Sequence, residues 1–176
     1  ENEMRNVANK IKTSNIYITP TLSAYHHILL ATQQKEAYFE NDSLQFINPV
    51  LRFIGKKQLQ EWVELENNSN VELKYKIMQM MLKVLDEEGV ELLLGTDTGP
   101  NLTLPGFELF NEILLSLESG LSSYTVIASG TINAAKALGV GNTSGSVSVG
   151  KTADLILVDG NPLMDIYVLQ NPYAVI

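Results

Sequence analysis

Asp97 is the residue of this sequence best placed to do chemistry. It lies in the stretch ELLLGTDTGPN (residues 91–101), two residues beyond a nearly continuous apolar run. Such a run is typical of a buried strand in a parallel sheet, and parallel α/β folds bind ligands at the carboxyl ends of their strands. A carboxylate there can ligate a divalent metal or accept a proton from water, and Gly95 and Gly99 permit the bends that the loop needs. Spacing alone leaves a structural alternative open, in which Asp97 caps the next turn through an Asx hydrogen bond.

Several polar side chains could serve a site together with this aspartate. We expect Thr96 and Thr98 to orient the carboxylate through hydrogen bonds. His26 and Tyr25 follow a predicted strand and are candidates for contacting a substrate, and a histidine there could also supply a proton. The chain has two histidines, His26 and His27, and the alternative for such an adjacent pair is one packed and one solvated ring without function.

Two further motifs suggest other chemistries, and both fail in their context. The triplet DTG (residues 97–99) carries the catalytic carboxylate of aspartic proteases, but those enzymes use two carboxylates that share a proton. This chain has a single DTG triplet, between helical patterns. The stretch GSVSVGKT (residues 145–152) satisfies the pattern of a phosphate-binding loop, yet a strand pattern follows it where a helix is required. We therefore disfavour both a protease of that type and ATP or GTP binding.

Composition and charge exclude several classes of function. The chain has 176 residues, 45% of them apolar, and no cysteine, which excludes disulfide frameworks, thiolate metal sites and cysteine nucleophiles. The formal net charge is −8 and the lysines and arginines are scattered, which argues against binding to nucleic-acid phosphates. No apolar run has the length of a membrane span, and the first residues do not form a signal peptide. Both a cytoplasmic and an exported protein fit these observations.

The spacing of apolar residues predicts alternating strands and helices. The expected elements are strands at residues 15–22 and 90–95 and helices at residues 4–11, 24–41, 55–68, 71–87, 107–118 and 121–139. A loop is expected at residues 47–50, because the residue before a proline is biased away from helix. Glu112, inside one of the helices, is expected to be a surface or structural carboxylate. Strand and helix in alternation are typical of parallel α/β folds.

After residue 141 the pattern of the sequence changes from long helices to short strands and turns. We therefore predict a first domain in residues 1–141 and a smaller β segment in residues 142–176. Within the β segment, the alternation predicts short strands at residues 146–149 and 154–158, separated by the turn GKTA, and an extended end at residues 166–176.

Five stretches, in order along the chain, carry a family resemblance. They are ITPTL, GVELLLGTDTG, LPGFELFNEI, SGLSSYTVIASGTINAAKALG and GSVSVGKTADLILVDGNPLMDI. Together they resemble the C-terminal part of metal-dependent amidohydrolases, in particular the imidazolonepropionase-like branch that includes Xaa-Pro dipeptidases. The resemblance implies an α/β fold, the C-terminal fragment of a (β/α)8 TIM barrel with part of a small β-sandwich domain. Residues 15–22 would form the seventh barrel strand and residues 90–97 the eighth, and Asp97 would bind metal and act as the base toward the hydrolytic water.

Most ligands of such a metal site are missing from this chain. The family's His-x-His pair, its bridging lysine or glutamate and its two later histidines have no counterpart here, and Phe110 stands where many relatives have a histidine. A catalytic zinc needs about three protein ligands, so Asp97 alone cannot hold one. The resemblance therefore implies one or two divalent metals, zinc by preference, whose other ligands belong to a missing N-terminal part of the barrel. We expect the chain alone to be inactive and poorly folded, since a barrel closes to remove its strand edges.

The activity that the resemblance implies is hydrolysis of an amide bond, in a cyclic amide or in a dipeptide. The rival interpretation is a non-catalytic chain, either a truncated paralogue or a binding module that kept the tail of the fold and lost its chemistry. The expected partners are a small amide or dipeptide substrate and the missing part of the barrel. Neither nucleic acid nor a membrane is expected, and a homo-oligomer is compatible with the sequence.

Overall fold

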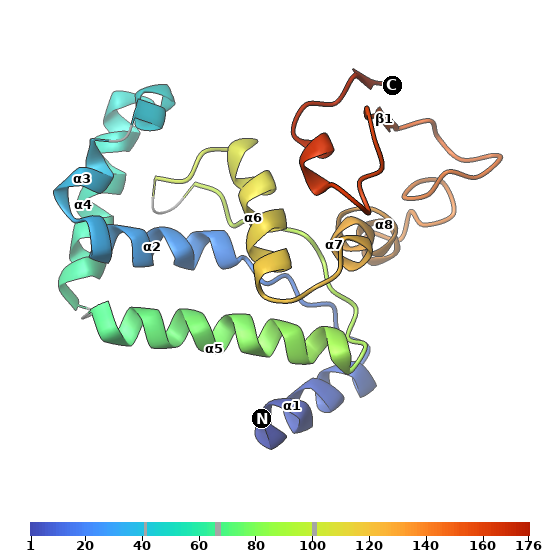
Figure 1. Cartoon of the computed structure of the whole chain (residues 1–176), viewed down its shortest axis with the longest axis horizontal. Coiled ribbons are helices and arrows are strands. Elements are labelled where there is room, and N and C mark those ends of the chain that lie inside the picture. The colour runs from blue at the N-terminus through green and yellow to red at the C-terminus, as the bar shows by residue number, and fades with distance from the viewer. Residues whose placement is uncertain (41, 66–67, 100–101) are drawn as a thin grey trace. The chain divides into compact units, whose positions relative to one another are not determined.

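The computed structural model describes residues 1–40, 42–65, 68–99 and 102–176 (Figure 1). These residues form two compact units, each made of segments that are far apart in the sequence. The first unit comprises residues 1–20, 82–94 and 116–176, and the second comprises residues 21–81 and 95–115. The boundary expected after residue 141 falls inside the first unit and stays a prediction.

The first unit contains a parallel pair of short extended segments. Ile18 and Leu92 form a parallel bridge. The Ile18 N–H donates to the Glu91 carbonyl at 3.1 Å, and the Leu93 N–H donates to the Ile18 carbonyl at 2.8 Å. These two slanted bonds are the pattern of parallel strands. The two segments predicted as strands therefore lie side by side and run in the same direction, although their paired part is a single bridge.

Helix α1 (Asn2–Thr13) is held against the end of α5 (Asn68–Glu87) by charged groups. The Arg5 guanidinium contacts the Glu88 carboxylate at 2.6 Å. The Lys12 ammonium donates to the Glu88 carbonyl at 2.7 Å, at the end of α5 where unpaired carbonyls attract a cation. The amphipathic pattern of residues 4–11 thus predicted this helix correctly.

Two helices stand in the first unit where the sequence predicted one. Helix α7 (Ser123–Gly130) begins after Ser122, whose hydroxyl accepts the Thr125 N–H at 3.0 Å, and α8 (Ile132–Ala137) follows after a break. At this break the Ser129 carbonyl accepts the Leu94 N–H at 3.2 Å. The backbone N–H groups of an extended segment need partners, and the carbonyl at the helix break supplies one to the Leu94 N–H.

Helices also make up the second unit. They are α2 (Leu22–Gln34), α3 (Glu36–Phe39), the 3-10 helix η1 (Asp42–Phe46), α4 (Pro49–Leu65), the first part of α5 and most of α6 (Phe107–Glu118). The loop expected at residues 47–50 is confirmed at residues 47–48, including Asn48 before the proline, but it ends there because α4 begins at Pro49. The Asn48 side chain accepts the Val50 N–H at 2.9 Å, and Pro49 takes the first helical position. Both are start signals that the sequence carries.

The C-terminal segment has less regular structure than the sequence predicted. Strand β1 (Ile156–Leu157) pairs antiparallel with β2 (Ala174–Val175). The strand expected at residues 154–158 is thus reduced to β1, and the one expected at residues 146–149 is wrong, since no strand forms there. The 3-10 helix η2 (Ile166–Leu169) interrupts the end that we expected to be extended. Strand propensity depends on neighbouring strands that cover an apolar face, and the two-residue pair described here supplies little of that cover.

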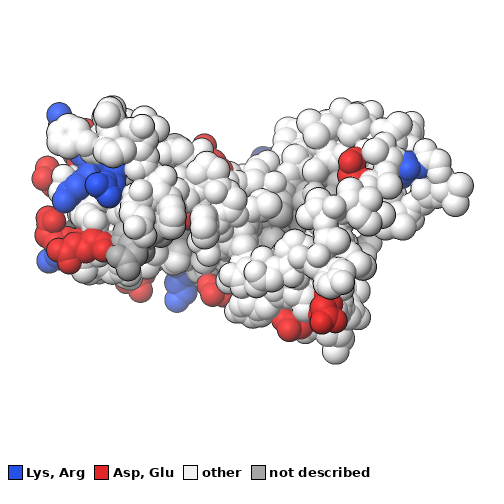
Figure 2. Space-filling model, turned by 90° about the horizontal axis from the view of Figure 1, so that it is seen from above, with Lys and Arg blue, Asp and Glu red and all other residues white. Residues whose placement is uncertain are grey.

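Charged side chains are dispersed over the surface in view. On the face that Figure 2 shows, lysine and arginine lie among aspartate, glutamate and broad uncharged areas. Of the helices in the described ranges, none is long and apolar enough to cross a membrane.

Candidate functional site

Asp97 lies on an exposed bend in the loop that follows the second extended segment. Its backbone is left-handed (φ 51°), a conformation that aspartate tolerates better than most residues, and Gly99 takes φ 128°. We expected Gly95 and Gly99 to make the bends, but Asp97 and not Gly95 takes the positive φ. The Asp97 carboxylate makes no hydrogen bond to any residue of the described ranges, so the structure lends no support to an Asx cap.

Thr96 and Thr98 flank the aspartate and bond to each other. Their hydroxyls share a hydrogen bond that bridges over Asp97. Two residues on from Asp97, the Gly99 N–H donates to the Thr103 hydroxyl at 2.9 Å. The orienting role that we expected for the two threonines stays a prediction. Within the described part of the chain they brace the backbone around Asp97 rather than bond to its carboxylate.

Glu112 is a buried carboxylate that holds the start of α2. Its Oε1 accepts the Leu22 N–H at 2.9 Å, its Oε2 accepts the Ser23 N–H at 2.7 Å, and the residue is 0% exposed. The first N–H groups of a helix lack partners within the helix, and Thr21 before α2 is left-handed and makes no side-chain cap. Burial raises the pKa of Glu112, against the opposing effect of these hydrogen bonds. Of the two roles expected for Glu112, the structural one is correct and the surface one is wrong.

Ser23 joins this support to the loop that carries Asp97. Its hydroxyl donates to the Thr96 carbonyl at 3.2 Å, and the residue is 1% exposed. Thr96 immediately precedes Asp97 in the chain. A continuous series of contacts therefore runs from Glu112 on α6 through Ser23 on α2 to the candidate loop. The sequence carries no local sign of it, because Ser23 lies 73 positions from Thr96 and 89 from Glu112.

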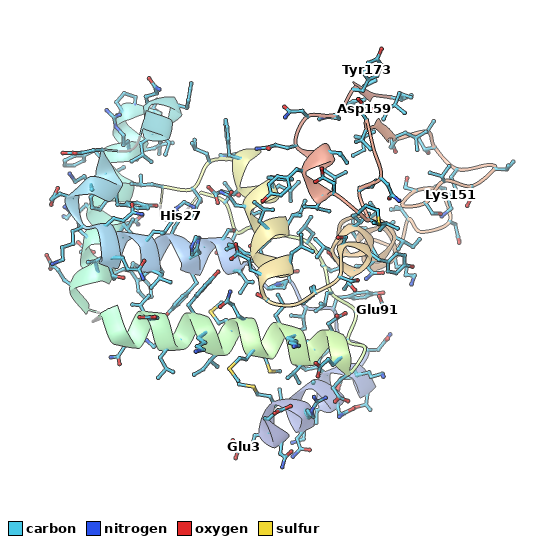
Figure 3. All side chains as sticks on the ribbon, viewed as in Figure 1. Glu3, His27, Glu91, Lys151, Asp159 and Tyr173 are labelled. Carbon is cyan, nitrogen blue, oxygen red and sulfur yellow. The ribbon has the colours of Figure 1, made fainter. Side chains whose placement is uncertain are left out.

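A second buried network centres on His27, which Figure 3 labels on α2. Its Nε2 lies 3.0 Å from a Glu108 carboxylate oxygen, and its Nδ1 lies 2.5 Å from the Tyr38 hydroxyl. Burial alone would raise the pKa of Glu108, but the hydrogen bond and charge of His27, with help from Asn111, outweigh it and lower that pKa. Burial raises the pKa of Tyr38, so its hydroxyl stays protonated beside Nδ1. The network ties together α2, α3 and α6.

His26 and Tyr25, the predicted substrate contacts, are both half-buried on α2. The His26 ring stacks on Tyr75, with ring centroids 5.4 Å apart. Burial, and then the neighbouring His27, lower the pKa of His26, so the ring is neutral at pH 7. Both histidine rings are thus packed, rather than one packed and one solvated. The substrate-binding roles of Tyr25 and His26 stay predictions.

The donor atoms of this chain do not fit a complete metal site. Within residues 1–40, 42–65, 68–99 and 102–176, no three histidine, aspartate or glutamate side chains gather in a group that could hold a metal ion. Glu108 is engaged by His27, and Glu112 by the N–H groups of α2. Asp97 can supply one ligand, while a catalytic zinc takes about three from protein. A metal beside Asp97 would need ligands that the described residues do not supply.

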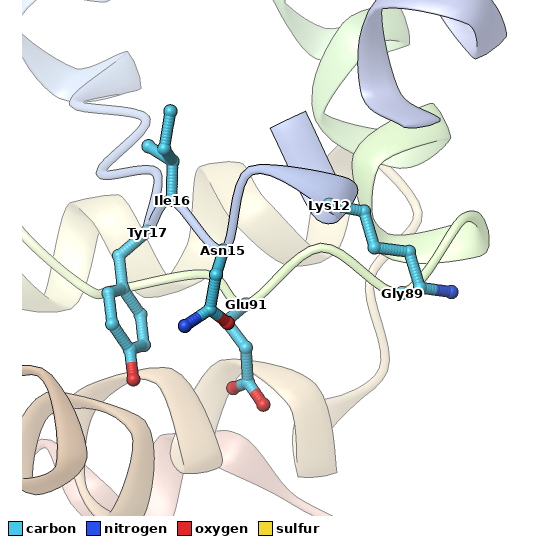
Figure 4. A pocket seen from close by; sticks show the side chains of 6 residues that line it. All are labelled: Lys12, Asn15, Ile16, Tyr17, Gly89 and Glu91. Carbon is cyan, nitrogen blue, oxygen red and sulfur yellow. The ribbon is translucent and has the colours of Figure 1, made fainter. Parts of the chain in front are cut away.

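The first unit contains a hollow of about 280 Å³ beside the paired segments. It is lined by Lys12, Asn15, Ile16, Tyr17, Gly89 and Glu91, whose side chains Figure 4 shows. These residues precede Ile18 and Leu92 in the two segments, so the hollow lies at their amino ends. Barrels of parallel strands place catalysis at the carboxyl ends, the end from which the Asp97 loop departs.

Two parallel segments pair with each other, and helices connect them along the chain, so this is an α/β protein. Its candidate site is the carboxylate in the loop after the second segment, beyond a strand end. Comparison with known proteins identifies the family within this class. Residues 6–176 match the amidohydrolase family, and the chain belongs to that family. The resemblance to its imidazolonepropionase and Xaa-Pro dipeptidase branch is confirmed by relatives of both kinds.

Two curated relatives match about half of the chain. An imidazolonepropionase from Syntrophobacter fumaroxidans is 32% identical over 98 residues, which cover 49% of this chain and 23% of the relative. A 5-methylthioadenosine/S-adenosylhomocysteine deaminase from Teredinibacter turnerae is 36% identical over 97 residues, which cover 51% of this chain and 22% of the relative.

Solved structures resemble nearly the whole chain. A Xaa-Pro dipeptidase with methionine bound in its active site is 25% identical with a TM-score of 0.69, over 97% of this chain and 35% of the dipeptidase. Bottromycin amidohydrolase shares the fold at 22% identity and a TM-score of 0.57, over 70% of this chain and 28% of that protein. The matched region thus spans between 22% and 35% of the length of these four proteins.

Proposed function

We propose that this chain is the C-terminal part of a hydrolase that cleaves a carbon–nitrogen bond in a cyclic amide or a dipeptide. The observation that carries the proposal is the family match over residues 6–176 together with Asp97 in the loop after a parallel segment. The names of the relatives support the substrate class, since they include imidazolonepropionases and a Xaa-Pro dipeptidase. The rest of the barrel comes from a part of the protein outside these residues.

Proton transfer is what this chain would contribute to the reaction. Asp97 takes a proton from the water that attacks the carbonyl carbon and passes it to the leaving nitrogen, so that one carboxylate serves both steps. Its exposed position and its freedom from other described hydrogen bonds leave both oxygens available for this role. A divalent metal, zinc by preference, would have to be held mainly by ligands from elsewhere in the protein.

The test is the Asp97→Asn variant of the complete protein, assayed against a panel of cyclic amides and dipeptides. We expect turnover to fall by about 100-fold or more, as for loss of a general base, with an unchanged unfolding midpoint. Asp159→Asn, at an exposed aspartate of the C-terminal segment, is the matched control and should keep full turnover. Near-normal turnover in the Asp97 variant would refute the role of this carboxylate.

The rival is a non-catalytic protein of the same family. The lack of a metal-ligand group among the described residues is the observation that favours it. A complete protein that neither hydrolyses any member of the panel nor retains divalent metal would establish the rival. Hydrolysis by residues 1–176 alone would contradict the view that the chemistry needs the rest of the barrel.

A further inference from the structure

The carboxylate of Glu112 does more than supply partners to the first N–H groups of α2. A serine or aspartate at the position before a helix can satisfy such groups from the surface, without burying a charge. Here the residue before α2, Thr21, makes no side-chain cap, and the acceptors come from α6 on a residue that is 0% exposed. A buried carboxylate carries a desolvation cost, so this arrangement costs more than a local cap would. What it adds is a connection between α6 and the first residues of α2.

That connection extends to the loop of Asp97 through a single residue. Ser23 is held at both ends, because its N–H donates to Glu112 and its hydroxyl donates to the Thr96 carbonyl. Thr96 is in turn bonded through its hydroxyl to Thr98, on the far side of Asp97. The backbone is thereby restrained on both sides of the aspartate. A catalytic base displaced by about 1 Å can lose about 100-fold in rate, so such restraint has consequences for a base.

We propose that Ser23 and Glu112 are positioning residues that hold the loop of Asp97 in place through the Ser23–Thr96 hydrogen bond. The link between the loop and α2 does not depend on what the protein does. Its consequence for turnover rests on the proposed function, in which Asp97 is the base.

The sharpest variant is Ser23→Ala in the complete protein, because it removes the hydroxyl that donates to the Thr96 carbonyl and keeps both bonds from the N–H groups of α2 to Glu112. The same hydroxyl also interacts with the Glu112 carboxylate, and this interaction is lost with it. Ser129→Ala is the matched control, since Ser129 is a buried serine whose hydroxyl also donates to a backbone carbonyl, that of Val126, at 2.7 Å. Hydrogen–deuterium exchange of the peptide that covers residues 95–99 is the first measurement. Loss of one hydrogen bond of about 1 kcal/mol predicts exchange about fivefold faster in Ser23→Ala and unchanged in Ser129→Ala. Equal exchange in Ser23→Ala and the wild-type protein would overturn the proposal.

Turnover is the second measurement and separates positioning from general loss of stability. We expect kcat to fall about 5–30-fold in Ser23→Ala with KM unchanged. The reason is that a displaced base stabilises the transition state less but leaves substrate binding as it was. Glu112→Gln, which keeps one acceptor oxygen, should speed exchange of the same peptide and lower kcat in the same direction.

The outcomes distinguish this proposal from the proposed function. If Asp97→Asn abolishes turnover while Ser23→Ala has wild-type kcat and wild-type exchange, the positioning role is wrong and the function stands. If Asp97→Asn keeps full turnover, the function is wrong, and the exchange of residues 95–99 still decides whether Ser23 holds the loop.

Discussion

Replacing Glu112 with glutamine is expected to lower the free energy of unfolding by about 1–3 kcal/mol. The carboxylate accepts two backbone N–H groups, at 2.9 and 2.7 Å, in a fully buried position. Glutamine keeps one acceptor oxygen and turns an amide donor toward the other N–H. A hydrogen bond to a charged group contributes about 1.5–3 kcal/mol, and a buried N–H without a partner costs about 1–3 kcal/mol. The variant also relieves the cost of burying the charge, the cause that raises the pKa of Glu112, and this reduces the net loss.

Urea unfolding of the complete protein, followed by circular dichroism, measures this loss. We expect a lower midpoint with an unchanged slope in Glu112→Gln and no change in Glu118→Gln, at an exposed glutamate of the same helix. The raised pKa of Glu112 also sets the sign of a pH effect. The stability linked to a raised carboxyl pKa is fully present below the ordinary value of 4.5 and is lost as pH rises through the pKa of the folded state. The deficit of the variant should therefore be larger at pH 4 than at pH 7, and a wild-type midpoint at both would refute the reasoning.

Two further predictions test other contacts, the first of them with a control variant. In Gly145→Ala the new Cβ would lie 2.5 Å from the Ala135 Cβ at a φ of 86°, so we expect a loss of about 2–4 kcal/mol by urea unfolding. Gly150→Ala, with φ 89° and no atom within 4 Å, should lose only the backbone part of about 1–2 kcal/mol, and equal losses would contradict the packing argument. Glu108 has a pKa lowered below 4.5 by His27, so it contributes stability that is present above pH 4.5 and lost as pH falls through the lowered pKa. Glu108→Gln should therefore flatten the acid decline of stability between pH 6 and pH 3, and parallel declines in the variant and the wild-type protein would assign that decline to other groups.

Helices were predictable from the sequence wherever their signals are local. The period of apolar residues in α1 and α6 acts over a few residues, and the structure confirms both helices. The start of α4 was equally local: the rule that disfavours helix before proline correctly left Asn48 outside the helix, but we did not use Asn48 and Pro49 as signals that a helix begins at residue 49.

Elements whose form depends on distant partners were not predictable. Residues 121–139 have the pattern of one helix, yet the chain breaks where the Ser129 carbonyl accepts the Leu94 N–H. Residues 146–149 alternate as a strand does but form none. A strand is stabilised by its neighbours across the sheet, and a local pattern does not say whether those neighbours are present.

The sequence by itself was enough to identify the family, through motifs over most of the chain. It was also enough to propose Asp97, after an apolar run, as the carboxylate of the candidate site, and that role stays a prediction. Only the tertiary structure showed that Glu112 is buried against the start of α2 and that Ser23 reaches the Thr96 carbonyl. The physical reason is range. Hydrogen bonds act over about 3 Å, and folding alone brings together partners that are 73 and 89 positions apart in the chain.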